Sequence, residues 1–265
     1  MDYIEAMRHR HSVRTYIDKP ISAEQREALL IAIDELETPF GGRVKIVLAE
    51  KNGESSFKPS TYGVITGARC YLLLYVDDDV PSLLSGGYAL EMVVLKATML
   101  GLGTCWLGGT FSASSFKTVE NAPNGMKLVI VCPVGIPASK QSLMHKITEA
   151  IARSHCRKPM DKLFGQGGFD KRVAETSPFY EPLEMMRLAP SSVNSQPWRA
   201  LVFDDETVQF FTTSQKSLNL IDMGIGLCHF AIAANMKNKR GHFSISSLKK
   251  VDSPPAGLHY VVSYS

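Results

Sequence analysis

Basic residues gather near the N-terminus, where residues 9–20 read HRHSVRTYIDKP. Arg10, Arg14 and the Ser12 hydroxyl can all donate hydrogen bonds, and a guanidinium group matches the oxygens of a phosphate in geometry and charge. Free backbone N–H groups near a helix end would complete such a site. Taken by itself, however, the segment is more typical of a solvent-exposed basic turn than of a phosphate site.

A second polar stretch, LAPSSVNSQPWR at residues 188–199, joins an expected helix to an expected strand and is stiffened by Pro190 and Pro197. Its polar side chains offer both donors and acceptors: Ser191, Ser192, Asn194 and Gln196. Such a loop suits the edge of a flat heteroaromatic ring, such as the pyrimidine of a flavin or a nucleobase. The alternative is a loop that caps a helix, and for Trp198 we favour the role of an ordinary core residue.

The glycine-rich segment GLGTCWLGGTF, residues 101–111, would let backbone approach a ligand closely at Gly108 and Gly109. A glycine stop at the end of a helix explains half of this pattern, so the segment alone is weak evidence for a site. Cys105 is expected to be a small buried apolar residue.

Together with the strand VIVCPVGIP (129–137), these motifs resemble the FMN-dependent nitroreductase family and span most of the chain. The resemblance implies that the phosphate and ribityl chain of FMN are held by Arg10, His11, Ser12, Arg14 and Arg157. It implies contacts with the flavin ring from Pro190, Ser191, Ser192 and Asn194. It also implies that the backbone of Leu107, Gly108 and Gly109 faces the reactive nitrogen of the ring. With the motifs taken together, the N-terminal basic turn is interpreted as a phosphate seat.

The order of the motifs departs from that family. The ring-contact loop normally follows the first long helix, but here ETPFGGRVKIV (37–47) occupies that place and the loop comes much later. A fused pseudo-dimer, most similar to the variant called the putative TM nitroreductase family, is the simplest interpretation. We expect a first half, residues 1–158, that holds the phosphate seat, and a second half, residues 159–265, that holds the ring-contact loop. One FMN would then bind per chain, in a monomer, and a further homodimer stays open.

In such a protein the flavin carries the chemistry, so no catalytic side chain is expected. NADH or NADPH would reduce the FMN, and a small acceptor such as a nitroaromatic or a quinone would reoxidise it. Two alternatives stay open: an FMN-binding carrier or sensor without significant turnover, and a nucleotide-binding protein that uses the same basic turn.

An α+β fold follows from the resemblance, with a mixed, mainly antiparallel sheet flanked by helices in two related halves. Hydrophobic periodicity predicts helices at 2–8, 89–100, 142–154 and 223–241, and a helix that begins after Ser22 with Gln25 completing a capping box. Strands are predicted at 43–50, 68–77, 127–137, 199–203, 207–213 and 258–264. The stretch 68–77 is apolar on both faces and is therefore expected to be central. The glycine-rich residues 165–171 are typical of a crossing between elements.

The helices expected at 89–100 and 225–236 resemble each other when Gly87 is aligned with Gly224. This internal similarity favours one structural half used twice. We expect the two helices to pack against each other as the former dimer interface.

Composition excludes several classes of protein. The 265 residues are 45% hydrophobic and 21% charged, as in a soluble globular protein. A net charge of +3 is too small to argue for nucleic acid as a partner. Five cysteines without a C-x-x-C pair, and no apolar leader, favour a reduced cytoplasmic protein. The seven histidines do not cluster with cysteines, so no metal is expected. The longest apolar runs, such as residues 70–76, are expected to be far too short to span a membrane.

Overall fold

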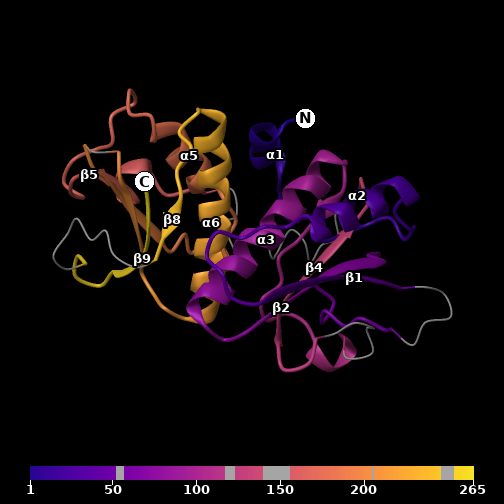
Figure 1. The fold of residues 1–265 in the computed structure, drawn as a ribbon. Helices are drawn as coiled ribbons and strands as arrows, with labels where there is room; N and C mark the ends of the chain where they lie inside the picture. Colours follow the sequence, from indigo (N-terminus) through magenta and orange to yellow (C-terminus); the bar gives the residue numbers. More distant parts are fainter. Residues whose placement is uncertain (52–56, 117–122, 140–155, 205, 246–253) are drawn as a thin grey trace. The chain divides into compact units, whose positions relative to one another are not determined.

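A computed structural model describes residues 1–51, 57–116, 123–139, 156–204, 206–245 and 254–265, and the remaining residues are drawn in grey (Figure 1). The helix expected at 142–154 lies outside the described residues. The chain divides into two compact units. Unit 1 comprises Met1–Glu37, Arg43–Asp78 and Leu90–Arg153, and unit 2 comprises Thr38–Gly42, Asp79–Ala89 and Ser154–Ser265. The expected boundary between residues 158 and 159 stays a prediction.

Unit 1 is built on a four-stranded antiparallel sheet with the strand order β1-β2-β4-β3. Its strands are β1 (Val44–Glu50), β2 (Cys70–Val76), β3 (Gly103–Thr104) and β4 (Lys127–Gly135). Its helices are α1 (Tyr3–His9), α2 (Ala23–Asp34), the second half of α3 (Val80–Met99) and the 3₁₀ helix η1 (Ala113–Phe116). Every residue of β2 is buried, and β2 lies between β1 and β4, which confirms that it is central.

Both short N-terminal helices begin with reciprocal caps. In α2 the Ser22 hydroxyl accepts a hydrogen bond from the Gln25 N–H (3.2 Å), and the Gln25 side chain accepts one from the Ser22 N–H (3.0 Å). This confirms the capping box expected from the sequence. Asp2 and Glu5 make the same pair of bonds at the start of α1. Because each cap satisfies two otherwise orphaned N–H groups, it fixes where its helix begins.

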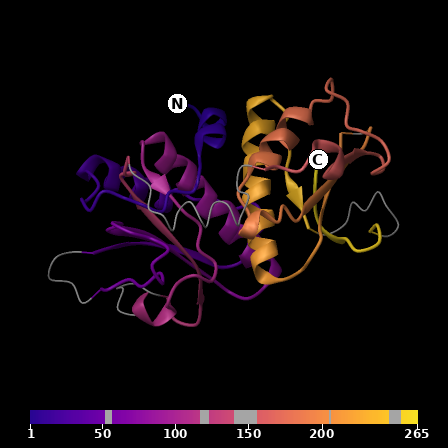
Figure 2. The same cartoon turned by 180° about the vertical axis from the view of Figure 1, so that it is seen from behind.

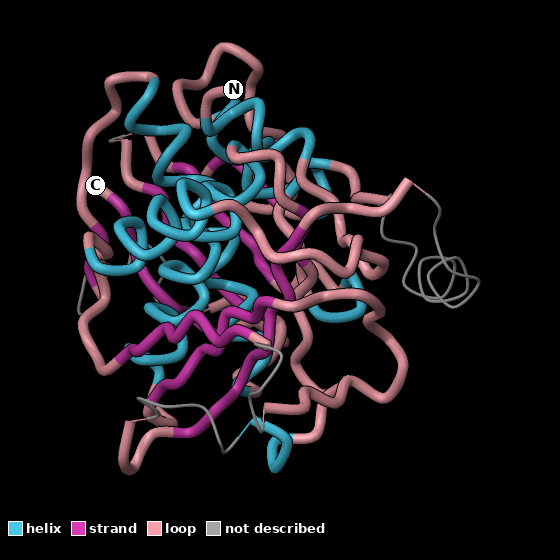
Figure 3. Tube along the Cα trace, turned by 90° about the vertical axis from the view of Figure 1, so that its right-hand side faces the viewer, coloured by secondary structure: helices cyan, strands magenta, loops and turns pink. Residues whose placement is uncertain are grey.

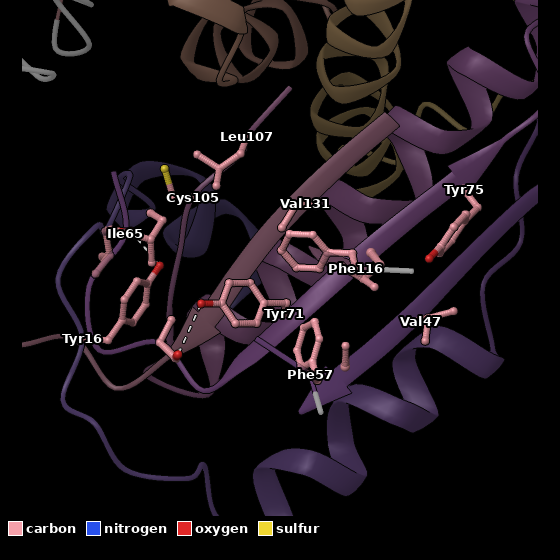
Figure 4. Packing of buried hydrophobic residues seen from close by; sticks show 14 residues of the cluster. Tyr16, Val47, Phe57, Ile65, Tyr71, Tyr75, Cys105, Leu107, Phe116 and Val131 are labelled. Atoms are coloured by element: carbon pink, nitrogen blue, oxygen red, sulfur yellow. Dashed lines mark hydrogen bonds between the residues drawn. The ribbon is translucent and has the colours of Figure 1, made fainter. Parts of the chain in front are cut away.

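An aromatic cluster fills the core on one face of the unit 1 sheet (Figure 4). The rings of Phe57, Tyr71 and Phe116 meet in T-shaped pairs with centroids 5.5–5.9 Å apart. Tyr16 belongs to the same cluster, and its hydroxyl donates to the Val13 carbonyl oxygen at 2.6 Å. Tyr16 therefore anchors the segment that follows the N-terminal basic residues to this core.

Unit 2 is built on a five-stranded sheet with the strand order β5-β6-β7-β9-β8. Its strands are β5 (Phe164–Gln166), β6 (Trp198–Val202), β7 (Val208–Thr212), β8 (Phe243–Ser244) and β9 (His259–Tyr264). The β5–β6 pair is parallel and the other pairs are antiparallel. Helices α5 (Tyr180–Leu188) and α6 (Ser217–Met236) lie side by side (Figure 1 and Figure 2), and the 3₁₀ helices are η2 (Met160–Lys162) and η3 (Ser192–Asn194). Long loops and turns connect many of the helices and strands (Figure 3).

The sheets confirm the expected α+β class with mainly antiparallel pairing, although the strands form two sheets and not one. The crossing expected at 165–171 is wrong in part, because residues 165 and 166 belong to β5. Phe164 is buried and pairs with Ala200, so the chain is an extended strand here. The turn follows at Gly167, which has a positive φ. Local glycine content predicted the turn but missed the short strand before it.

Helices α3 and α6 approach each other within unit 2 at two glycines. A Cβ on Gly87 would lie 2.1 Å from the Ile221 carbonyl oxygen, and one on Gly224 would lie 2.1 Å from the Leu84 carbonyl oxygen. The two apolar helices therefore contact each other within unit 2 at residues 84–88 and 221–225. Packing of residues 89–100 against 225–236 as a former dimer interface stays a prediction. The expected start of α3 at Ala89 is wrong, because the helix begins at Val80 and uses its glycines for this close approach.

Helix α6 is long and apolar enough, by length and composition alone, to cross a membrane. Most of it is buried inside the protein, and the core helix of a soluble protein passes the same test. It begins at Ser217 and ends at Met236, so the expected bounds of 223–241 are shifted by about one and a half turns.

Candidate functional site: a basic turn and a strained polar loop

The backbone after the basic turn runs extended along unit 1. Ser12 forms a parallel bridge with Thr104, and the Val13 N–H donates to the Thr104 carbonyl oxygen at 2.8 Å. Further along, the Tyr16 N–H donates to Thr66 at 2.9 Å. These backbone hydrogen bonds hold the segment in place without a ligand.

Glycines in unit 1 make room for this segment. A Cβ on Gly67 would lie 2.1 Å from the Tyr16 carbonyl oxygen, and one on Gly103 would lie 2.7 Å from a Val13 methyl group. Gly67 also has a positive φ of 78°, which side chains rarely adopt. These glycines are therefore needed for the seating of the basic segment, a role that the sequence patterns did not reveal.

Arg10 and Arg14 place unpartnered polar atoms in the interior of unit 1. Arg14 is only 8% exposed. Nε and Nη1 of Arg10, Nε of Arg14 and Oγ1 of Thr104 are buried, and none of them has a hydrogen-bond partner among the residues that the structure describes. A buried donor that stays unpaired costs roughly 1–3 kcal/mol, and more if it is charged. An anion with several acceptor oxygens would satisfy this set of donors.

Cys105 lies beside these arginines but does not neutralise them. Burial raises the pKa of the Cys105 thiol, while Arg14, Ser12 and Arg10 lower it to a smaller extent. The thiol is therefore neutral at physiological pH. Its burial confirms the expected role as a small apolar residue.

The end of α1 contributes less to the basic turn than expected. Arg10 is the C-terminal cap of α1, and its N–H donates to the Ala6 carbonyl oxygen at 2.8 Å. A helix C-terminus presents carbonyl groups, so the expected backbone donors do not come from this helix. His11 is exposed, with Nδ1 3.1 Å from the His9 carbonyl oxygen, and stands outside the buried set.

The glycine-rich segment differs from the expectation at its first residue. The Leu107 N–H donates to the Val131 carbonyl oxygen at 3.0 Å, and the Leu107 side chain belongs to the aromatic cluster (Figure 4). The Leu107 amide is therefore engaged within unit 1 and is not open to a flavin nitrogen. Gly108 and Gly109 are exposed, and a Cβ on Gly109 would meet no atom within 4 Å. The surrounding protein does not require a glycine at position 109.

The polar loop of unit 2, residues 190–196, is conformationally strained. Val193, Asn194 and Gln196 all have positive φ angles, of 46°, 56° and 48°. Such angles are uncommon outside glycine, and they cluster where function constrains the backbone. Val193 is 82% exposed at the tip of the loop, so burial of its side chain does not explain the conformation.

Asn194 ties the loop to the segment at residues 156–158. Its Nδ2 donates to the Cys156 carbonyl oxygen at 2.7 Å, and its Oδ1 accepts from Arg157 Nη1 at 3.0 Å. Arg157 also donates to the Leu188 carbonyl oxygen, at 2.9 Å from Nη2. The structure thus places Arg157, expected at the phosphate, against the ring-contact loop within unit 2. Asn194 holds the loop through these bonds, and its contact with a flavin ring stays a prediction.

A buried carboxylate anchors the other side of the loop. Asp222, on α6, is 4% exposed, and its two oxygens accept from the Ser192 N–H at 3.0 and 3.1 Å. Burial raises the pKa of Asp222 to about 7, although hydrogen bonds from Ser192 and Ser195 oppose this shift. Sequence reasoning missed Asp222, and its one signal was an acidic residue within the apolar run IDMGIGLCHF.

The remaining expected residues of the loop lie around this framework. The Ser191 hydroxyl accepts from the Gln196 N–H at 2.9 Å, and Pro190 is half-buried. Trp198 is fully buried, which confirms its role in the core, and its indole N–H meets no hydrogen-bond acceptor in the described part of the chain. Ser191 stands at the N-cap position of the three-residue helix η3, without a side-chain capping hydrogen bond.

The fold is that of the nitroreductases. A structure described as a putative nitroreductase from Thermotoga maritima MSB8 is similar over 100% of this chain and 93% of its own, with 17% identity and a TM-score of 0.64. A nitroreductase family protein from Clostridium difficile 630 is 16% identical over 67% of this chain and 99% of its own, with a TM-score of 0.46. A putative nitroreductase in complex with FMN from Desulfovibrio desulfuricans is 21% identical over 54% of this chain and 93% of its own, with a TM-score of 0.42.

The model of the family described as Putative TM nitroreductase matches residues 2–234. The chain belongs to this family, as the sequence motifs indicated. No curated protein sequence matches it significantly.

Proposed function

We propose that this protein is an FMN-dependent oxidoreductase of the nitroreductase type, which passes reducing equivalents from NADH or NADPH to a small acceptor such as a nitroaromatic or a quinone. The observation that carries the proposal is the set of buried, unpartnered donors on Arg10, Arg14 and Thr104. Family membership supports the same assignment.

The donor set suits the phosphate monoester of FMN. Such a group carries about −1.5 to −2 charges near pH 7 and three strong acceptor oxygens. Arg10 and Arg14 supply positive charge and N–H donors, and Thr104 adds a hydroxyl beside Ser12. Riboflavin lacks the phosphate, so it would leave these donors unpaired. The site is therefore proposed for FMN and not for the flavin ring alone.

The chain binds and positions the cofactor, and a bound FMN would supply the redox chemistry by taking electrons from the reduced nicotinamide and giving them to the acceptor. The exposed Gly108 and Gly109 leave room for a ring to approach the backbone. Pro190, Ser191 and Ser192 are proposed to contact the ring edge. Asn194 and Arg157 brace that loop and are proposed to contribute to flavin binding from there.

The purified protein provides the first test. It should be yellow, and FMN should be released on heat denaturation. NADH or NADPH should bleach the flavin absorbance without oxygen, and initial rates with a quinone should give the parallel lines of ping-pong kinetics, because both substrates would use one flavin face. A protein that retains no FMN would contradict the proposal. Bound FMN that neither nucleotide reduces would instead favour the carrier or sensor.

A further inference from the structure

Two cations lie beside the strained loop of unit 2. The Lys158 ammonium donates to the Ser195 carbonyl oxygen at 2.6 Å. Nη1 of Arg199 donates to the carbonyl oxygens of Trp198 (2.6 Å) and Gln196 (3.2 Å). Both side chains are half-buried, and both charged groups use backbone carbonyls from the same short stretch, residues 195–198. They therefore lie along the same short stretch of backbone, near enough for the charge of Arg199 to act on Lys158.

Their surroundings disfavour two uncompensated positive charges. Burial lowers the pKa of Lys158, and the charge of Arg199 lowers it further. Burial also lowers the pKa of Arg199. Glu184 is engaged by Arg187, whose Nη1 also donates to the Lys158 carbonyl oxygen. Asp222 is engaged by Ser192 and Ser195, and burial raises its pKa to about 7. It does not supply a full compensating charge at neutral pH.

Several other cations of unit 2 are paired with carboxylates. Three salt bridges join Arg187 to Glu184, Arg172 to Asp161 and Lys237 to Glu181. Among the residues that the structure describes, neither Lys158 nor Arg199 has such an ion pair. Since like charges repel more strongly where water is partly excluded, an external anion would stabilise this pair.

The two cations are also held in place. The Lys158 N–H donates to Gln196 Oε1 at 2.8 Å, and Gln196 is itself buried. Arg187 Nη1 donates to the Lys158 carbonyl oxygen at 3.4 Å. A preorganised pair of donors loses less side-chain entropy when a ligand binds.

We infer that Lys158 and Arg199 form a subsite for a phosphate group beside loop 190–196, separate from the basic turn of unit 1. An ammonium and a guanidinium together match a doubly charged phosphate in charge and donors. The inference rests on the proposed function in one respect, because the phosphate is taken to belong to the reduced nicotinamide dinucleotide. Free inorganic phosphate or pyrophosphate is the other source of the same chemistry.

Calorimetric titration with inorganic pyrophosphate tests the subsite directly, in protein saturated with FMN so that the basic turn is filled. The variants Lys158→Gln and Arg199→Gln should each weaken pyrophosphate binding by about tenfold or more, because each removes a charge-assisted hydrogen bond. The matched control is Lys171→Gln, an exposed lysine of the same unit, which should bind as the wild type does. Equal affinity in all four folded proteins would overturn the inference.

Steady-state kinetics then separate the two sources of phosphate. If the dinucleotide supplies it, both Lys158→Gln and Arg199→Gln raise KM for NADH or NADPH by about tenfold and leave kcat within about twofold. A loss specific to NADPH assigns the 2′-phosphate, and an equal loss with both assigns the pyrophosphate. Unchanged KM with weakened pyrophosphate binding assigns the free anion and overturns the dinucleotide part of the inference.

Failure of the proposed function would look different. If the protein retains no FMN, the proposed function is contradicted but the subsite is not. The titration is then done with the Arg14→Ala variant, so that pyrophosphate does not bind at the basic turn. Pyrophosphate binding that still depends on Lys158 would support the subsite without a flavin. Binding that is independent of both Lys158 and Arg199 would overturn it.

Discussion

At the scale of single residues, the candidate site is marked by polar groups that the fold buries at a cost. Arg10 and Arg14 bury guanidinium nitrogens in unit 1 that have no hydrogen-bond partner among the described residues, and Asp222 brings into unit 2 a carboxyl group whose pKa burial raises to about 7. Ionisable groups whose pKa is perturbed as that of Asp222 is are concentrated at functional sites. The two features differ, because the arginines have buried nitrogens without a described partner and the aspartate is already hydrogen-bonded.

Replacement of Arg14 by alanine should weaken FMN binding by about ten- to a hundredfold, because it removes a charge-assisted hydrogen bond worth about 1.5–3 kcal/mol. Stability without FMN should fall little, because the lost side chain has an unpaired buried Nε. Flavin titration and thermal unfolding check the two statements. The control is Arg26→Ala, a surface arginine of the same unit paired with Glu50, and unchanged FMN affinity in Arg14→Ala would refute the phosphate assignment.

Asp222 should make stability depend on pH. Its pKa is raised from 3.8 to about 7 in the folded state, so folding favours the protonated form. The contribution is complete below about pH 4 and is lost as the pH rises through about 7, by linkage. The free energy of unfolding in urea should therefore fall more steeply over this pH range for the wild type than for Asp222→Asn. Parallel pH profiles of the two proteins would show that Asp222 titrates normally.

At the scale of elements, the long helices are positioned by close backbone contact. Gly87 of α3 and Gly224 of α6 each leave no space for a Cβ beside a carbonyl oxygen of the opposite helix. The polar loop 190–196 lies between α5 and β6, and Asp222 on α6 accepts a hydrogen bond from its backbone. The position of α6 within unit 2 therefore helps to fix the backbone of the candidate ring-contact loop at Ser192.

Gly224→Ala should destabilise the protein by at least about 1–3 kcal/mol, because the added methyl group would overlap backbone that cannot move aside without shifting a helix. Chemical unfolding measures this loss. Gly109→Ala serves as the matched control, since its Cβ would meet open space, and its stability should equal that of the wild type. Equal stability of Gly224→Ala and wild type would mean that the two helices do not approach this closely in solution.

At the scale of the whole molecule, the motifs are distributed between two units. Unit 1 carries the basic turn and the glycine-rich segment, and unit 2 carries the polar loop, Arg157 and the cation pair. The fused pseudo-dimer remains our interpretation of this distribution. Under this interpretation each chain, with one copy of each motif, would be self-sufficient for one flavin.

Flavin titration combined with light scattering should give one FMN per chain in a monomer, because a single basic turn and a single ring-contact loop are present. A mixing experiment checks whether they act within one chain. Chains carrying Arg14→Ala and chains carrying Asn194→Ala should not restore FMN binding to each other when combined. Two flavins per chain, or restoration on mixing, would show that the site is shared between chains.

The sequence by itself determined the fold class, the family, the capping box at Ser22 and the central strand at 70–76, because these depend on local periodicity and on short motifs. It also identified Arg10, Arg14 and the loop at 190–194 as candidates. It could not show that guanidinium atoms are buried without partners, since burial and hydrogen bonding arise from segments far apart in the chain.

Tertiary structure alone decided the rest. The Leu107 amide is hydrogen-bonded to Val131, and Arg157 is hydrogen-bonded to Asn194. Helix α3 begins at Val80, earlier than the sequence predicted. Tertiary structure also brings Asp222 to Ser192 across 30 positions of sequence. Each of these depends on which distant backbone or side chain fills a given space, and spacing along the chain does not encode that.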